Sequence, residues 1–258
     1  MKKFLNKILQ RKIHPASATL FVIAILIHNY TKDEGMDAYK DKRYDLAHKV
    51  WMASAEKDDA LAQYNIGMLY NTQSFHLSSK EKAYKWYKKS ANLGYAPALL
   101  SLGDFYQNGI VVDKNTAKAI ELYKKSAKQE NPDSFGVLAE LYFQEKDYKN
   151  AKKWLIKINR RGDGTAYTFY KLGYIYENGF DVKINKNKAI QMYESAAERG
   201  FFKAQFKLGK FYYKDGKHPA SVKGKKWLNK ALKNPKIDTE TKTHIENILK
   251  IEEKTTNN

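Results

Sequence analysis

Ser79-Lys80-Glu81-Lys82 is the segment of this 258-residue chain whose spacing could support covalent chemistry. In penicillin-interacting enzymes, the serine of a Ser-x-x-Lys motif is the nucleophile, and Ser-Asp-Asn and Lys-Thr-Gly elements complete the site. Neither companion element occurs in this sequence. The motif on its own therefore gives little support for acyl transfer.

Other catalytic or metal-binding patterns are also weak. The six histidines are scattered, at His14, His28, His48, His76, His218 and His244. They form neither a His-Glu-x-x-His motif nor a pair of ligands four residues apart. Asp58-Asp59 is more simply a polar turn than a catalytic carboxylate pair, and no glycine loop that could cradle a phosphate is present. We therefore predict that the chain is not an enzyme and that it holds no metal or cofactor.

The glycines instead mark an internal repeat. A phrase of a hydrophobic residue, Gly, two variable residues and Tyr recurs, with its second residue at Gly67, Gly103, Ala139, Gly173 and Gly209. Successive copies lie 36, 36, 34 and 36 residues apart. This period is typical of a solenoid of helical hairpins. A solenoid presents an extended surface, which favours binding over catalysis.

Each repeat contains two amphipathic helices, named helix A and helix B here. Helix A carries the glycine. Helix B begins near a Lys-Ala pair about 16 residues later, followed by an aromatic and a small residue, as in Ala119, Tyr123 and Ala127. Spacings of four residues place such side chains on one helical face. Because glycine disfavours a helix interior, its recurrence predicts a close crossing of the two helices.

The helix ends carry capping residues. Asn115 lies four residues before Ala119 and is predicted to cap helix B. Ser79 stands in the same place relative to Ala83, so we interpret Ser79 as a helix cap and Lys82 as the ordinary lysine of the repeat. Further caps are predicted at Gly109 and Gly179 after helix A, at Asp147 and Asn185 before helix B, and at Gly94, Gly162 and Gly200 after helix B.

The combined pattern resembles a known family. Ala-x-x-x-Leu-Gly-x-x-Tyr, a Gly/Val/Asn loop, Lys-Ala-x-x-x-Tyr-x-x-x-Ala and a closing Gly resemble the Sel1-like repeat (SLR), a relative of the tetratricopeptide repeat. The resemblance covers roughly residues 35–234 and implies an all-α fold, a right-handed α/α superhelix. The last repeat departs most from the pattern, because Lys223 replaces the helix-B alanine while Trp227 and Ala231 keep the later positions.

The domain organisation follows from the repeat. We place an opening half-repeat at 36–59, repeats at 60–94, 95–131, 132–162, 163–200 and 201–234, and a C-terminal capping helix and tail at 235–258. The capping helix is expected over 236–252.

Residues 1–34 lie outside the repeat pattern. Five basic residues precede an apolar run over 18–27, which is the order of a bacterial export signal. Residues 13–31 carry no Lys, Arg, Asp or Glu, and such a segment is nearly long enough to span a bilayer. We favour an uncleaved signal anchor in the cytoplasmic membrane, with the repeats on the periplasmic or extracytoplasmic side. The alternative is a cleaved signal and a periplasmic or secreted protein.

The chain is strongly basic, with a formal net charge of +19. Many lysines lie on helix B, at Lys85, Lys88, Lys89, Lys118, Lys124, Lys125, Lys149, Lys152, Lys153, Lys223, Lys225 and Lys226. One interpretation is a solvated outer face that keeps the stack soluble. The other is adhesion to an anionic envelope polymer or partner. Nucleic acid is not predicted, because no reader motif is present and lysine far outnumbers arginine.

The resemblance implies that the A helices line a concave surface. Positions one and four after the repeat glycine vary between repeats in charge and size, as a partner-binding surface or an unconstrained surface would. They are Met68, Asn71, Asp104, Gln107, Glu140, Phe143, Tyr174, Glu177, Lys210 and Tyr213.

The function implied by the resemblance is a non-catalytic adaptor or scaffold of the bacterial cell envelope, which binds a protein partner on the concave face. A cell-wall or anionic-polymer accessory protein and a secreted effector that binds a host protein are the alternatives.

Overall fold

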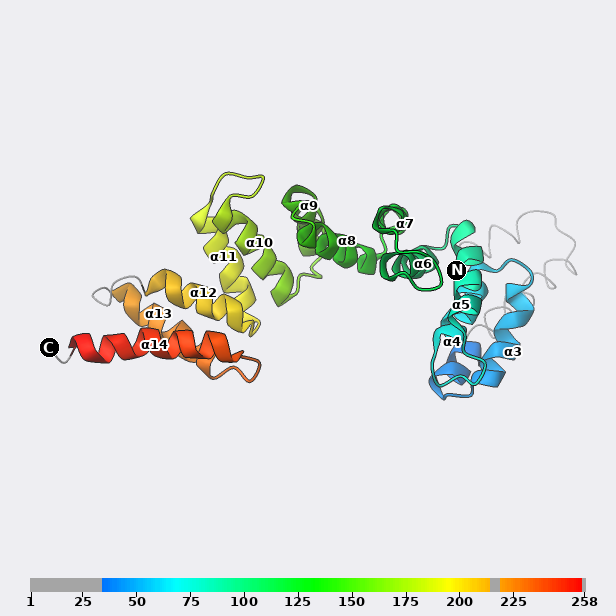
Figure 1. The fold of residues 1–258 in the computed structure, drawn as a ribbon, viewed down its shortest axis with the longest axis horizontal. Coiled ribbons are helices and arrows are strands. Elements are labelled where there is room, and N and C mark those ends of the chain that lie inside the picture. The colour runs from blue at the N-terminus through cyan, green and yellow to red at the C-terminus, as the bar shows by residue number, and fades with distance from the viewer. Residues whose placement is uncertain (1–33, 214–218, 257–258) are drawn as a thin grey trace, which may run out of the picture. The chain divides into compact units, whose positions relative to one another are not determined.

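The computed structural model describes residues 34–213 and 219–256 (Figure 1). Over these residues every regular element is a helix, and none is a strand. The described residues form two compact units, with the boundary between Asn131 and Pro132. In each unit, consecutive helices pack against each other. The expected fold class, an all-α solenoid of helical hairpins, is therefore confirmed.

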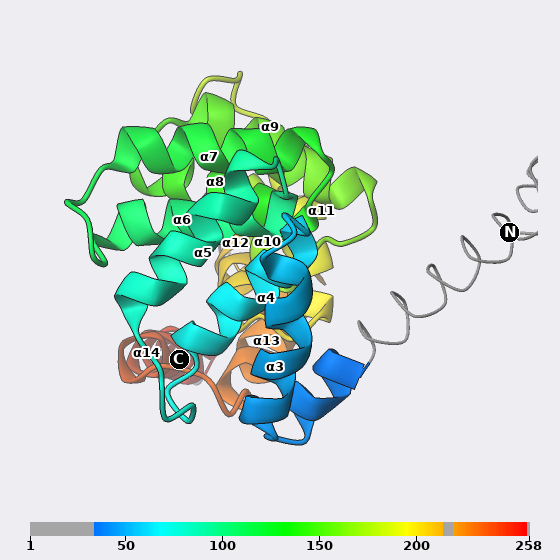
Figure 2. The same ribbon diagram turned by 90° about the vertical axis from the view of Figure 1, so that its right-hand side faces the viewer.

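The first unit contains residues 34–40, which are helical, and five longer helices. These are α3 (Tyr44–Ala55), α4 (Ala60–Asn71), α5 (Lys80–Asn92), α6 (Ala96–Asn108) and α7 (Thr116–Lys128). The most extensive contacts join α4 to α5 and α6 to α7, which are the predicted A–B hairpins. Helix α3 lies beside α4 in both views (Figure 2) and packs Trp51 into the core that they share.

The second unit contains seven helices among its described residues. They are α8 (Pro132–Gln144), α9 (Tyr148–Arg160), α10 (Ala166–Asn178), α11 (Lys186–Glu198), α12 (Phe202–Tyr212), α13 (Pro219–Leu232) and α14 (Thr239–Thr256). Hairpins form between α8 and α9, α10 and α11, and α12 and α13. The terminal helix α14 covers the last hairpin by packing the fully buried Ile245 against Leu228 and Ala231.

The predicted signal anchor lies outside the described residues, apart from Glu34. Within the described part of the chain, no helix is long and apolar enough to cross a membrane.

The helix caps follow the sequence prediction. Asn115 Oδ1 accepts a hydrogen bond from Lys118 N at 2.9 Å, and Ser79 Oγ accepts one from Lys82 N at 3.2 Å. Asp147 and Asn185 cap α9 and α11 in the same way. Gly109 and Gly179 end α6 and α10 in the left-handed conformation, which glycine adopts without strain. The interpretation of Ser79 as a helix cap is confirmed.

The repeat glycine of helix A leaves room for a buried ring on helix B. A Cβ added to the glycine would lie far inside van der Waals contact with that ring, at 2.7 Å in the pair Gly67–Tyr87, 2.5 Å in Gly103–Tyr123 and 2.6 Å in Gly173–Tyr193. All three rings are almost completely buried, so they have little room to move aside. The predicted close crossing is confirmed.

The third repeat uses a different pair of residues at this crossing. Ala139 replaces the glycine, and Leu155 replaces the tyrosine. Both are buried and belong to one core cluster. The extra methyl of Ala139 is accommodated beside a smaller partner, so the total volume of the pair changes little.

The expected register of the fifth repeat is wrong. A Cβ added to Gly209 would meet Leu228 Cδ2 at 2.4 Å, so Leu228 occupies the position that we assigned to Trp227. Gly224 is buried, and a Cβ on it would lie 2.8 Å from the backbone nitrogen of Tyr213. Gly224 therefore takes the place of the helix-B alanine, and Lys223 is free to lie at the surface.

Candidate partner-binding surface

The ten residues predicted to bind a partner lie on α4, α6, α8, α10 and α12, except Tyr213, which caps α12. Nine of them are half-buried, and Lys210 is exposed. Their side chains do not form one uniform surface, because several of them make contacts that hold the repeats together.

In the first unit, two of the predicted residues are tied to neighbouring helices. Asn71 Oδ1 accepts a hydrogen bond from Lys80 Nζ at 2.5 Å, and Asp104 Oδ1 accepts one from Tyr123 OH at 2.8 Å. Burial raises the pKa of the Asp104 carboxyl, and the hydrogen bond from Tyr123 opposes that rise. Met68 packs against the core between α3, α4 and α5. Gln107 Oε1 is buried and has no hydrogen-bond partner among the described residues.

In the second unit, Phe143 and Tyr174 come together. Their ring centroids are 5.8 Å apart, and Phe143 also contacts Tyr148 at 5.3 Å. Tyr148 stacks on Phe180 with centroids 4.2 Å apart. All four rings are half-buried, so they present an aromatic cluster between α8, α9 and α10. The sequence prediction missed Tyr148 and Phe180, although an aromatic residue stands at each of these helix ends where the second repeat has Thr116 and Ile110.

The predicted glutamates pair with lysines of the next repeat. Glu140 on α8 forms an ion pair with Lys171 on α10. Glu177 on α10 forms one with Lys207 on α12, with Oε2 and Nζ 2.9 Å apart, and also accepts a hydrogen bond from Tyr193 OH at 2.6 Å. Each lysine stands two residues before its repeat glycine. These ion pairs therefore join consecutive A helices.

Lys210 and Tyr213 are not part of the aromatic cluster. Lys210 Nζ lies 5.5 Å from the centroid of the Phe206 ring, and Tyr213 packs against the core cluster between α12, α13 and α14. The structure thus brings Glu140, Phe143 and Tyr174 close together and leaves these two at the C-terminal end of the unit.

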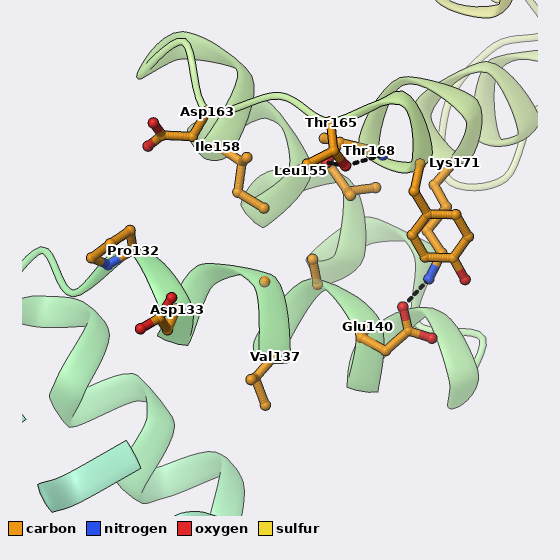
Figure 3. A pocket seen from close by; sticks show the side chains of 13 residues that line it. Pro132, Asp133, Val137, Glu140, Leu155, Ile158, Asp163, Thr165, Thr168 and Lys171 are labelled. Atoms are coloured by element: carbon orange, nitrogen blue, oxygen red, sulfur yellow. Dashed lines mark hydrogen bonds and ion pairs between the residues drawn. The ribbon is translucent and has the colours of Figure 1, made fainter. Parts of the chain in front are cut away.

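A groove of about 510 Å³ opens beside the aromatic cluster (Figure 3). One wall belongs to α8, and the others belong to α9, to the α9–α10 turn and to the first turns of α10. Its lining residues include Pro132, Gly136, Val137, Leu155, Ile158, Thr165, Tyr167 and Thr168. In the close-up, Pro132 and Asp133 lie at one end, and the ion pair of Glu140 with Lys171 lies at the other.

Lys171 lies at the end of the groove that adjoins the aromatic cluster. Its side chain is only 4% exposed, and its amine lies over two rings, 4.3 Å from the centroid of Phe143 and 4.4 Å from that of Tyr167. A buried lysine is stable only when its charge is paired, and the Glu140 carboxylate supplies that pairing. This one side chain therefore connects the groove to the aromatic cluster.

The groove is open at Gly136, and much of its lining is apolar. A Cβ added to Gly136 would meet no atom within 4 Å, so this glycine faces open space rather than a packed helix. Two of the lining carboxylates are paired with cations, Asp163 with Arg161 at 3.0 Å and Glu140 with Lys171. Tyr167 remains 47% exposed at the rim. Such a surface suits an apolar segment of a protein better than a charged small molecule.

The described residues offer little to a metal ion or a nucleophilic reaction. They contain no cluster of three or more His, Asp or Glu side chains that could hold a metal. Ser79 Oγ donates to the Glu81 carboxylate at 2.7 Å, and Lys82 Nζ lies over the Tyr70 ring, 5.2 Å from its centroid. The two groups thus serve the helix end and a neighbouring ring.

Comparison with known proteins agrees with the fold and the repeat. The Sel1 repeat family matches residues 60–95, 96–131, 138–163, 170–201 and 202–235, which is more than half of the chain. The chain therefore belongs to the Sel1 repeat family, as its resemblance predicted.

Two solved structures show the same architecture. A Sel1 repeat protein from Oxalobacter formigenes is 27% identical, with a TM-score of 0.68, over 84% of this chain and 98% of that one. A protective antigen of uropathogenic Escherichia coli with an SLR fold is 28% identical, with a TM-score of 0.62, over 80% of this chain and 44% of that one.

Two relatives whose function or family is named are longer than this chain. Chitin synthase regulatory factor 3 of Schizosaccharomyces pombe is 26% identical over 169 residues, which are 61% of this chain and 18% of that protein. A putative sel1-like repeat-containing protein of Acanthamoeba polyphaga mimivirus is 25% identical over 233 residues, which are 81% of this chain and 44% of that protein. The chain spans less than half the length of either relative.

Proposed function

We propose that this protein is a non-catalytic adaptor that docks a protein partner on the A-helix side of its repeats. In the second unit, the partner places an apolar segment in the groove between α8 and α10, beside the aromatic cluster of Phe143, Tyr148, Tyr174 and Phe180. The observation that carries the proposal is the open, apolar groove at Gly136, which the packing of the repeat leaves unfilled. A relative named as a chitin synthase regulatory factor is consistent with such a role.

The geometry supports docking of a segment that brings apolar side chains. The lining combines Val137, Leu155 and Ile158 with the half-exposed ring of Tyr167. Burial of apolar surface contributes roughly 25 cal/mol per Å², and exposed aromatic rings are common anchors of interfaces. Pairing of Asp163 with Arg161 and of Glu140 with Lys171 reduces the charge that an apolar segment would bury there.

Gly136 provides a variant that separates binding from folding. Gly136→Leu fills the groove from within, while the exposed helical position gains helix propensity of roughly 0.5–1 kcal/mol. The matched control Gly136→Ala brings the same backbone change but leaves most of the groove open. Partners recovered with the wild-type chain from native cells would be identified, and their affinity for each purified variant would be measured by interferometry.

The proposal predicts that Gly136→Leu weakens partner binding by about tenfold or more, equal to about 1.4 kcal/mol. Gly136→Ala should bind like the wild type, and both variants should have thermal midpoints no lower than that of the wild type. Unchanged affinity of the Gly136→Leu variant would refute groove docking.

We also propose that the repeats act on the extracytoplasmic side of a bacterial cytoplasmic membrane. The support is the order of a basic segment and an apolar run within residues 1–34. Protease digestion of spheroplasts should remove the repeats while a cytoplasmic marker stays intact, and mass spectrometry of the native N-terminus should find Met1 or Lys2. Protection of the repeats from protease in intact spheroplasts would contradict this location.

A further inference from the structure

A second groove lies in the first unit, between the two B helices α5 and α7. Its volume is about 640 Å³. Four lysines and two amides, Lys88, Asn92, Lys118, Lys125, Lys128 and Gln129, are among its lining residues. Four apolar side chains, Ala91, Leu99, Leu102 and Leu122, also line it and are themselves buried. The groove therefore combines an apolar floor with a basic rim.

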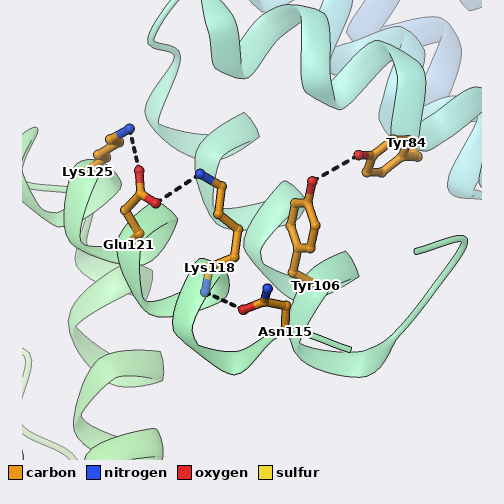
Figure 4. Close-up of polar contacts among 6 residues, drawn as sticks. All are labelled: Tyr84, Tyr106, Asn115, Lys118, Glu121 and Lys125. Carbon is orange, nitrogen blue, oxygen red and sulfur yellow. Dashed lines mark hydrogen bonds and ion pairs between the residues drawn. The ribbon is translucent and has the colours of Figure 1, made fainter. Parts of the chain in front are cut away.

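Hydrogen bonds hold the groove in shape at both ends. Gln129 Nε2 at the end of α7 donates to the backbone oxygen of Gly94 at 2.7 Å, which joins α7 to the α5–α6 turn. At the other end, the hydroxyls of Tyr84 and Tyr106 lie 3.1 Å apart and join α5 to α6 (Figure 4). A ligand would therefore meet a surface that is already formed, which reduces the entropy lost on binding.

The rim already holds one carboxylate. Glu121 lies between two rim lysines, 2.9 Å from Lys118 Nζ and 2.8 Å from Lys125 Nζ (Figure 4). These two amines lower the pKa of the Glu121 carboxyl to about 2. The other two rim lysines, Lys88 and Lys128, have no ion pair with a described residue. The groove thus keeps two cationic groups available for an incoming anion.

The repeat does not require these lysines. When the repeats are aligned on Ala119 and Ala189, the positions of Lys125 and Lys128 on α7 correspond to Ser195 and Glu198 on α11. Folding of the hairpin is therefore compatible with neutral or acidic side chains at both places.

We propose that this groove binds an acidic peptide segment of a second protein. An apolar side chain of that segment lies on the floor, and flanking carboxylates pair with Lys88 and Lys128. The combination of floor and rim favours this occupant over a bare polyanion, which would leave the floor unused. A flat membrane surface is also disfavoured as the occupant, because it could not reach the recessed leucines. The net charge of +19 disfavours a second copy of this chain as the occupant. The site is independent of the groove in the second unit.

The test measures binding of a fluorescein-labelled peptide, Glu-Glu-Leu-Leu-Glu-Glu, to the full chain by fluorescence anisotropy. The test variant is the double substitution Lys88→Glu and Lys128→Glu. The matched control is Lys85→Glu with Lys89→Glu, which changes the net charge equally at exposed positions of α5 that do not line the groove. Circular dichroism checks that both variants keep their helical content.

We expect the test variant to weaken peptide binding by about tenfold or more, with the control within about twofold of the wild type. Replacement of the two peptide leucines by serines should weaken binding to the wild type as well. Equal losses in both variants would overturn the proposal, because binding would then depend on overall charge. Polyphosphate or phosphatidylglycerol vesicles that bind more tightly than the peptide, with the same dependence on Lys88 and Lys128, would also overturn it.

Discussion

Replacement of Gly103 by alanine tests the packing rule of the repeats in which a helix-A glycine faces a buried helix-B tyrosine. An added Cβ would lie 2.5 Å from Cε1 of Tyr123. Carbon atoms in contact prefer separations of about 3.5–4.0 Å, so the ring would have to move by about 1 Å. Tyr123 is only 1% exposed and donates a hydrogen bond to Asp104, so this movement disturbs the core of the second repeat.

The expected loss of stability can be worked out from two opposing effects. Overpacking of a well-packed core costs about 1–3 kcal/mol, and the tight contact at Gly103 places it near the upper end. Alanine regains about 1 kcal/mol of helix propensity relative to glycine. Gly103→Ala should therefore lower the free energy of unfolding by about 2 kcal/mol.

The third repeat suggests the compensating change, because it pairs Ala139 with Leu155. Tyr123→Leu alone should be destabilising, since it leaves a cavity and removes the hydrogen bond to Asp104. Together with Gly103→Ala, it should be less destabilising than the sum of the single effects by about 1–3 kcal/mol. Urea unfolding, monitored by circular dichroism, gives the free energy of unfolding of the wild type, of each single variant and of the double variant. Additivity within about 0.5 kcal/mol would refute the steric explanation of the repeat glycine.

Three further predictions concern individual side chains. Glu140→Ala leaves the Lys171 amine buried without its carboxylate and should lower the free energy of unfolding in urea by about 3 kcal/mol. The double variant with Lys171→Met should regain most of this loss, because it removes the buried charge. A loss below about 1 kcal/mol in Glu140→Ala would contradict the pairing. Burial lowers the pKa of His48 and outweighs the opposing effect of Asp45, so the unfolded state binds more protons than the folded state between the lowered pKa and about 6.5. The contribution of His48 to stability is then complete above about pH 6.5 and declines as the pH falls through its folded-state pKa. His48→Gln should remove this part of the pH dependence of the urea midpoint. Tyr123→Phe should raise the pKa of Asp104 further, because it removes the hydrogen bond that favours the carboxylate; a chemical-shift titration of the side-chain carboxyl that shows no change would argue against this bond.

The sequence was sufficient to predict the hairpins and their caps, because each depends on local spacing. The glycine phrase locates helix A, and residues such as Asn115 and Ser79 locate the start of helix B. The register of α13 was misjudged for a physical reason. Glycine can replace the small helix-B alanine, so Gly224 offers a second register one residue after Lys223, and the residue pattern alone does not distinguish the two.

The candidate surface was predicted only in part. Phe143 and Tyr174 were assigned to the right helices, but the contacts that bring Tyr148 and Phe180 beside them depend on how three helices pack. One residue of the sequence could have indicated the groove. Gly136 lies inside helix A of the third repeat but not at the position of the repeat glycine, which Ala139 occupies. Lys171 could not be predicted as buried from residue type, since a lysine is normally exposed unless it is paired.

Site-specific photocrosslinking from the rim of the α8–α10 groove tests partner docking most directly. Benzoylphenylalanine at Tyr167 replaces one half-exposed ring at the rim with another, and the same residue at Phe211, which is 37% exposed on α12, serves as the control. In native cells, the Tyr167 position should yield one discrete adduct with a partner protein. That adduct should disappear in the Gly136→Leu background and persist in Gly136→Ala. An identical adduct from Phe211, or one that Gly136→Leu leaves unchanged, would contradict docking in the groove.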